Sequence, residues 1–187
     1  MNKKISQHIE NQDFVKIYIS NKKGIAIANF QGIIFAQSEN FIIMSDCQDF
    51  NFDGFVLIRK KDISKVAHTD SQIFFKKVLE KENIIQSIVE KYKLLELEFI
   101  DFKHIFEYVR NKNIALIIEC NYGKEDDFFI GPITDINDKK VKIKFLSTQG
   151  HLDMRPTSVK LKKITIVKIN SPYTDIYYKY AVGIETK

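Results

Sequence analysis

One stretch of this chain occurs twice, and this repeat limits the possible folds more than any other feature. Residues 57–77 (LIRKKDISKVAHTDSQIFFKK) align without a gap with residues 160–180 (KLKKITIVKINSPYTDIYYKY) at an offset of 103. The identical pairs are Lys60/Lys163, Ile63/Ile166, Lys65/Lys168, Ile73/Ile176 and Lys76/Lys179. Internal similarity of this kind indicates a duplicated structural unit. The chain is therefore predicted to contain two copies of one fold.

Each copy predicts a short helix followed by five short strands. In the first copy, Ile5 and Ile9 lie at helical spacing, and residues 14–20 alternate between apolar and polar side chains as a half-buried strand does. In the second copy, Asp101 precedes the helical pattern of FKHIFEYV, and NIALIIE follows as a strand. Gly131 matches Gly32 at an offset of 99, and a glycine inside a strand often marks a sharp bend. Residues 71–93 are predicted to be helical and to connect the copies.

This arrangement resembles the Sm-like proteins, whose small barrel is a variant of the SH3-like barrel. Their second motif runs apolar–Arg–Gly–x–x–Ile, and residues 58–63 read IRKKDI while residues 161–166 read LKKITI. The segments FEYVRNKNIALIIE and FIGPIT are also similar to a bacterial family of tandem barrels, a resemblance that implies no activity. The resemblance to Sm-like proteins covers residues 3–66 and 102–169.

The resemblance implies a mainly β chain with helices (α+β). It would contain two tandem Sm/SH3-like five-stranded barrels, each preceded by a short helix. The first barrel would span residues 1–70, a helical connector 71–100, and the second barrel with a C-terminal helix 101–187. Both copies carry Lys where the motif has Gly. A side chain at that tight turn blocks close backbone approach, so the resemblance implies the fold and not the family's uridine pocket.

Lysines alternate with apolar residues along the predicted strands of the second copy. They form a candidate nucleic-acid-binding face made of Lys140, Lys142, Lys144, Lys160 and Lys162. Such a face attracts phosphate, although a simple solvated surface has the same pattern. The corresponding positions of the first copy form an apolar stripe, a candidate interface made of Phe41, Ile43, Phe55 and Leu57. An apolar stripe on an outward face needs a cover, either within the chain or from a partner. Tyr173, Tyr177, Tyr178 and Tyr180 are available to stack on bases, but Tyr177 and Tyr178 align with Phe74 and Phe75 and are predicted to pack instead.

No catalytic or metal-binding pattern stands out, and the chain is not expected to be an enzyme or to need a cofactor. The histidines His8, His68, His104 and His151 have no companions at ligand spacing. Glu125, Asp126 and Asp127 form an acidic loop, and Asp135 and Asp138 form another. Paired carboxylates can act as acid and base or bind a metal, but turn formation and solubility explain them more simply.

Composition indicates a packed chain in a reducing compartment. The 187 residues carry a net charge of +5, with 15 Phe and 8 Tyr for a core. Cys47 and Cys120 show no pairing motif and are expected to be buried thiols. No apolar run reaches the length of a signal peptide or a membrane span, so the sequence predicts a cytoplasmic protein.

Two functions remain open from the sequence. The first is a binding protein that contacts RNA or an acidic protein through the basic face of the second copy. The second is a protein-interaction or assembly module without a nucleic-acid role. Neither involves a membrane, and either is compatible with a monomer or a small homo-oligomer.

Overall fold

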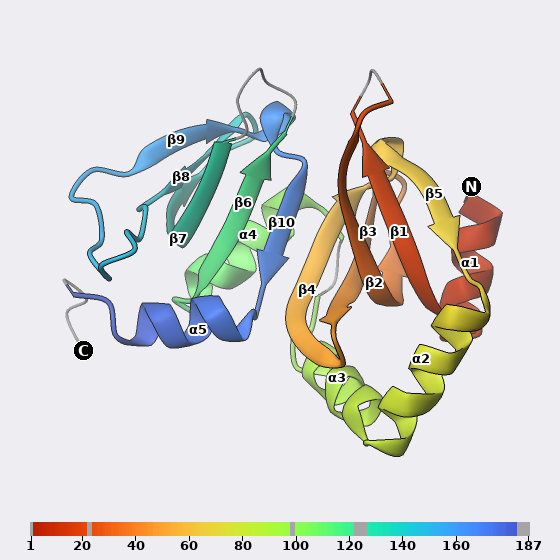
Figure 1. Cartoon of the computed structure of the whole chain (residues 1–187). Coiled ribbons are helices and arrows are strands. Elements are labelled where there is room, and N and C mark those ends of the chain that lie inside the picture. The colour runs from red at the N-terminus through yellow and green to blue at the C-terminus, as the bar shows by residue number, and fades with distance from the viewer. Residues whose placement is uncertain (1, 22–23, 98–99, 122–126, 183–187) are drawn as a thin grey trace. The chain divides into compact units, whose positions relative to one another are not determined.

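The structure is a computed structural model that describes residues 2–21, 24–97, 100–121 and 127–182. The chain divides into two compact units, residues 1–100 and residues 101–187. Ten strands and five α-helices lie within the described residues, and every strand runs antiparallel to the neighbours described here (Figure 1).

The first unit places three helices around a five-stranded sheet. Its sheet has the order β5-β1-β2-β3-β4. α1 packs against β2, α2 against β1, and α3 against β4. The elements are α1 (Asn2–Glu10), β1 (Phe14–Ser20), β2 (Ala26–Gln37), β3 (Phe41–Gln48), β4 (Asn51–Arg59), the 3-10 helix η1 (Lys60–Asp62), β5 (Ile63–Ala67), α2 (Asp70–Lys81) and α3 (Ile84–Lys93).

Within the described residues, the second unit repeats this order with one helix fewer after its last strand. Its sheet has the order β10-β6-β7-β8-β9. α4 packs against β7, and α5 packs against β6 and β7. The elements are α4 (Phe102–Asn111), β6 (Ala115–Cys120), β7 (Asp127–Ile136), β8 (Lys140–Ile143), β9 (Thr157–Lys160), the 3-10 helix η2 (Leu161–Lys163), β10 (Ile166–Ile169) and α5 (Pro172–Lys179).

The predicted pair of five-stranded barrels is wrong. Within the described residues, β5 does not pair with β4, nor β10 with β9, so the strands form unclosed antiparallel sheet. A barrel has no free edges, because its first and last strands hydrogen-bond to each other. The alternation of apolar residues shows which face of a strand is buried, but it does not show whether the outer strands meet. The chain is an α+β protein built on antiparallel sheet.

Helix boundaries follow local sequence signals. α2 begins after Thr69, whose backbone N–H donates to the Gln72 side chain over 3.2 Å, as in a capping box. α2 and α3 are separated at Asn83, which has a left-handed backbone with φ of 57°. α4 begins after Asp101, whose carboxylate accepts a hydrogen bond from the backbone N–H of His104 over 2.9 Å. The apolar face of α4 is buried, namely Phe102, Ile105, Phe106 and Val109.

The matched glycines mark a close backbone crossing in each unit. A Cβ on Gly32 would lie 2.2 Å from the Ser45 carbonyl oxygen, and a Cβ on Gly131 would lie 1.9 Å from the Lys144 carbonyl oxygen. No side chain fits at either distance. Both glycines lie in the long second strand of their unit, shortly before the register with the next strand shifts, between Ile34 and Ala36 in one unit and between Ile133 and Asp135 in the other. The sequence match between them therefore reflects a shared bend.

The repeated stretch matches in space at an offset of 101, not at the 103 of the alignment without a gap. β4 ends at Arg59 and β9 at Lys160, and the 3-10 turns that follow are capped by Ile63 and Ile164. In the strands after these turns, Val66 pairs with Ile17 and Val167 pairs with Ile118. The alignment is therefore two residues out of step with the structure, and Arg59 rather than Leu57 is the structural counterpart of Lys160.

Candidate functional site

The lysines of the second unit lie on a β-hairpin formed by β8 and β9. Lys140 pairs with Lys160, Val141 with Val159, and Lys142 with Ser158. Val141 and Val159 are buried, while the lysines on either side of them are exposed. Because strand side chains alternate between faces, burial of the valines fixes the lysines on the opposite, solvent-facing side.

A tight turn holds the first of these lysines in place. The side-chain oxygen of Asn137 accepts hydrogen bonds from the backbone N–H groups of Lys139 and Lys140, each over 3.0 Å. The Asn137 backbone N–H donates to the Lys140 carbonyl oxygen over 2.9 Å. The Leu161 backbone N–H donates to the Lys139 carbonyl oxygen, also over 2.9 Å, and so joins η2 to the turn. Three segments of the chain are thus fixed against one another by backbone hydrogen bonds.

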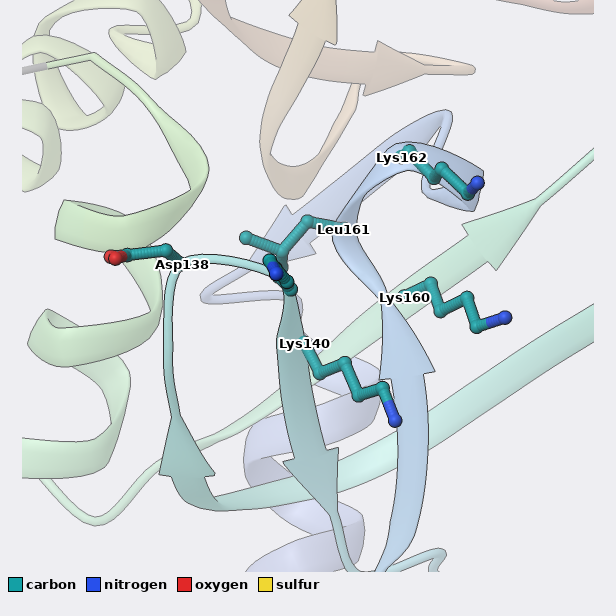
Figure 2. A pocket seen from close by; sticks show the side chains of 6 residues that line it. Asp138, Lys140, Lys160, Leu161 and Lys162 are labelled. Atoms are coloured by element: carbon teal, nitrogen blue, oxygen red, sulfur yellow. The ribbon is translucent and has the colours of Figure 1, made fainter.

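These segments surround a shallow hollow of about 350 Å³. We call it the lysine hollow, and its lining residues are Asp138, Lys139, Lys140, Lys160, Leu161 and Lys162. In the view of Figure 2, the side chains of Lys140, Lys160 and Lys162 extend to one side, and Asp138 extends to the other. Within the described part of the chain, no salt bridge joins a carboxylate to any lysine of the hollow. With four lysines and one aspartate, the hollow therefore carries a net positive charge.

The other predicted lysines behave differently. Lys142 forms a salt bridge with Asp135, with 3.0 Å between Nζ and Oδ2. The hydrogen bond and the charge of Lys142 lower the pKa of the Asp135 carboxyl. Lys144 lies one residue beyond β8 and is only half exposed, and its carbonyl faces Gly131. The structure thus brings together Lys140, Lys160 and Lys162 and adds Lys139, which the strand pattern missed because this residue lies in the turn.

The predicted apolar stripe of the first unit is buried. Phe41, Ile43, Phe55 and Leu57 are each 9% exposed or less. Phe55 is covered by aromatic rings of its own unit, with centroid distances of 5.8 Å to Phe35, 5.0 Å to Phe52 and 5.7 Å to Tyr92 of α3. The Arg59 guanidinium lies over the Phe41 ring.

Neither a metal-binding cluster nor a reactive thiol occurs in the part of the chain that the structure describes. No three His, Cys, Asp or Glu side chains there could hold a metal ion. Burial raises the pKa of the Cys47 thiol to about 12 and that of the Cys120 thiol to about 11, so neither is a ready nucleophile. Glu125 and Asp126 of the acidic loop lie outside the described residues.

One polar cluster was not predicted from the sequence. His8 at the end of α1 and His68 after β5 both face Asp13, with nitrogen–oxygen distances of 2.8 Å and 3.9 Å. The two imidazole rings are 5.6 Å apart between centroids. The five-residue spacing of His8 and Asp13 was visible in the sequence, but nothing there indicated that His68 would join them.

Comparison with known proteins adds no relative. No protein-family model, no curated protein and no solved structure matches this chain. The resemblance to the Sm-like proteins therefore stays a prediction, as does a cytoplasmic location. None of the described helices is both long enough and apolar enough to cross a bilayer.

Proposed function

We propose that this chain binds RNA through the phosphate backbone, using the lysine hollow of its second unit. The observation that carries the proposal is the pairing of Lys140 with Lys160 across β8 and β9. Like charges directly opposite each other in a sheet are destabilising. A phosphate placed between the two ammonium groups would offset that repulsion.

The chemistry of the hollow suits a backbone contact rather than base recognition. Lysine ammonium groups act as point charges, whereas guanidinium groups provide the planar fork that reads base edges. The charges lie on β8 and the turn before it, on β9 and on η2, so they are spread over more than one phosphate. The net charge of +5 adds a general attraction to polyanions. We therefore expect binding with little sequence preference.

The test compares two double variants of the whole chain. Lys140→Gln with Lys160→Gln removes the facing pair, and Lys103→Gln with Lys112→Gln removes two exposed lysines of the α4 region as the matched control. Fluorescence anisotropy with labelled single-stranded RNA is measured over a range of salt. We expect the first variant to bind more weakly and its log K to fall less steeply with log salt, by roughly 2 in slope. Absence of native binding at low salt, or an equal loss in the control, would contradict the proposal.

A second candidate is an assembly module without a nucleic-acid role, and one observation favours it. Three apolar side chains at helical spacing on and after α5 are well exposed, namely Tyr173 at 53%, Ile176 at 61% and Tyr180 at 73%. Such a face is common at interaction surfaces. Light scattering over a range of protein concentrations would detect self-association, and replacing Ile176 and Tyr180 by Ser would abolish it. A monomer at all concentrations would count against self-assembly.

A further inference from the structure

We infer a second binding site, on the exposed face of β5, β1 and β2 in the first unit, which takes single-stranded nucleic acid with a base stacked on Tyr18. This site shares no residue with the lysine hollow and does not depend on it. We call it the Tyr18 face. It consists of Lys16, Tyr18, Asn29, Gln31 and Lys65.

The register of three strands builds this face. β1 alternates along its length, so Ile17 and Ile19 are buried while Lys16, Tyr18 and Ser20 remain half exposed. Tyr18 pairs with Lys65 of β5 on one side and with Asn29 of β2 on the other. The tyrosine ring therefore lies on the middle strand, flanked by a cation and an amide.

Two ammonium groups converge on the tyrosine ring. The Lys16 Nζ lies 5.5 Å from the ring centroid, and the Lys65 Nζ lies 5.6 Å from it. A cation over an aromatic face is attracted to the ring, but the ring carries no net charge to neutralise it. The two positive charges near Tyr18 are thus held close together without being cancelled.

The surrounding strands provide no compensating charge. β1, β2 and β5 contain no Asp or Glu (FVKIYIS, AIANFQGIIFAQ and ISKVA). Neither Lys16 nor Lys65 has a salt bridge to a carboxylate among the described residues. A ligand that fits this face therefore carries negative charge.

The backbone under the ring is held by a chain of hydroxyl groups. The Ser20 hydroxyl donates to the Ser64 hydroxyl over 3.0 Å, and the Ser64 hydroxyl donates to the Tyr18 carbonyl oxygen over 3.1 Å. β1 and β5 are thereby joined beside the ring, at the point where their register shifts. A rigid base of this kind lowers the cost of ordering the site when a ligand binds.

Single-stranded nucleic acid combines the chemistry that this face offers. An aromatic side chain stacks on a base, and basic side chains beside it contact the phosphates on either side. The amides of Asn29 and Gln31 can donate to and accept from a base edge. A duplex hides its base faces, so it cannot stack on a tyrosine that is half buried in a sheet. A polyanion without bases would use the lysines alone.

The test distinguishes the contribution of base stacking to affinity from the contribution of phosphate contacts. The full chain is titrated against labelled oligouridylate, an abasic oligonucleotide of the same length, and heparin. We expect Tyr18→Leu to weaken oligouridylate binding about 5- to 150-fold, the range that loss of one stacked base produces. The same substitution should leave binding to the abasic strand and to heparin unchanged, and Tyr18→Phe should retain the native affinity.

Lysine variants keep the test informative if Tyr18→Leu fails to fold. Lys65 is exposed, so Lys65→Gln should fold, and it should lower the salt slope for oligouridylate by about 1. The Lys140→Gln and Lys160→Gln double variant should still prefer oligouridylate over the abasic strand, which distinguishes failure of the Tyr18 face from failure of the lysine hollow. Equal affinity of the native protein for oligouridylate and the abasic strand, or native affinity in a folded Tyr18→Leu variant, would overturn the inference.

Discussion

Lys140 lies directly opposite Lys160 in the hairpin of β8 and β9. The same two positions in the first unit hold Phe41 and Arg59, where the guanidinium carbon lies 5.4 Å from the centre of the phenylalanine ring. One copy of the fold thus places a cation against an aromatic ring, and the other places a cation against a cation. The second arrangement is the less stable of the two unless an anion joins it.

Substitution of Lys140 by Glu should stabilise the protein while weakening RNA binding. A Glu opposite Lys160 replaces repulsion by attraction, so we expect the free energy of unfolding to rise by about 0.2–1 kcal/mol at low salt. Lys162→Glu is the control, because Lys162 lies in η2 and has no lysine opposite it in the sheet. It should weaken binding without the gain in stability. Chemical denaturation and fluorescence anisotropy measure the two effects, and a loss of stability in Lys140→Glu would show that the two lysines do not repel.

Substitution of Asp135 by Asn should strengthen RNA binding. Asp135 forms a salt bridge with Lys142, and Lys142 lies on the same exposed face as Lys140 and Lys160. Freeing its ammonium group adds one phosphate contact, so the slope of log K against log salt should steepen by about 1. Addition of Lys142→Gln to this variant should remove the gain. Asp153→Asn, an exposed carboxylate in the loop after β8, serves as the control and should bind as the native protein does.

Substitution of Gly131 by Ala should destabilise the second unit severely. The new Cβ would lie 1.9 Å from the Lys144 carbonyl oxygen, and the backbone φ of 147° is itself unfavourable for a side chain. We expect the free energy of unfolding to fall by about 3 kcal/mol or more. Gly150→Ala measures the cost of the unfavourable backbone conformation alone. Gly150 has φ of 78°, but no atom lies closer than 4.0 Å to the added Cβ. Its cost should be about 1 kcal/mol. Equal melting temperatures for the two variants would contradict the close crossing.

The Asp13 carboxylate should make stability depend on pH. Burial acts to raise the pKa of Asp13, but the hydrogen bond to His8 and the charges of His68 and His8 outweigh it, so the pKa falls below its ordinary value of 3.8. A pKa that is lower in the folded state contributes stability above pH 3.8, and this contribution is lost as the pH falls through the lowered value.

Asp13→Asn should therefore lose on the order of 1 kcal/mol of unfolding free energy near neutral pH. The difference from the native protein should shrink toward zero in acid. Urea denaturation at a neutral and at an acidic pH measures it. Asp49→Asn, an exposed carboxylate in the same unit, is the control. A difference that grew in acid would have the wrong sign for a carboxylate with a lowered pKa.

Local features of this fold can be read from the sequence because they depend on neighbouring residues. The cap at Asp101 and the buried face of α4 follow from residue type and helical spacing. The bend at Gly32 and Gly131 follows from the match between the copies. The exposed lysines of β8 follow from their alternation with Val141 and Ile143.

Features that depend on distant residues could not be read in this way. Whether β4 and β5 pair with each other depends on how far all five strands of the unit bend. In the described residues these two strands do not pair, which is why the predicted barrels are wrong. Lys142 was predicted as part of a uniform basic face, but Asp135 on β7 pairs with it. The Tyr18 face requires the register of β5 on β1, which places residues 18 and 65 side by side. No local pattern encodes such a pairing.

Ile164 and Thr165 of the second copy are the counterparts of Ile63 and Ser64 of the first, because each pair directly follows its 3-10 turn. The Ser64 hydroxyl donates to the Tyr18 carbonyl oxygen over 3.1 Å, and the Thr165 hydroxyl donates to the Glu119 carbonyl oxygen over 2.8 Å. Both copies thus keep a hydroxyl side chain that ties the last strand to the first strand of the unit. The two copies of this chain therefore correspond through a Ser/Thr position that the alignment without a gap does not match, and distant relatives should be compared at this position rather than along the lysine-rich stretch.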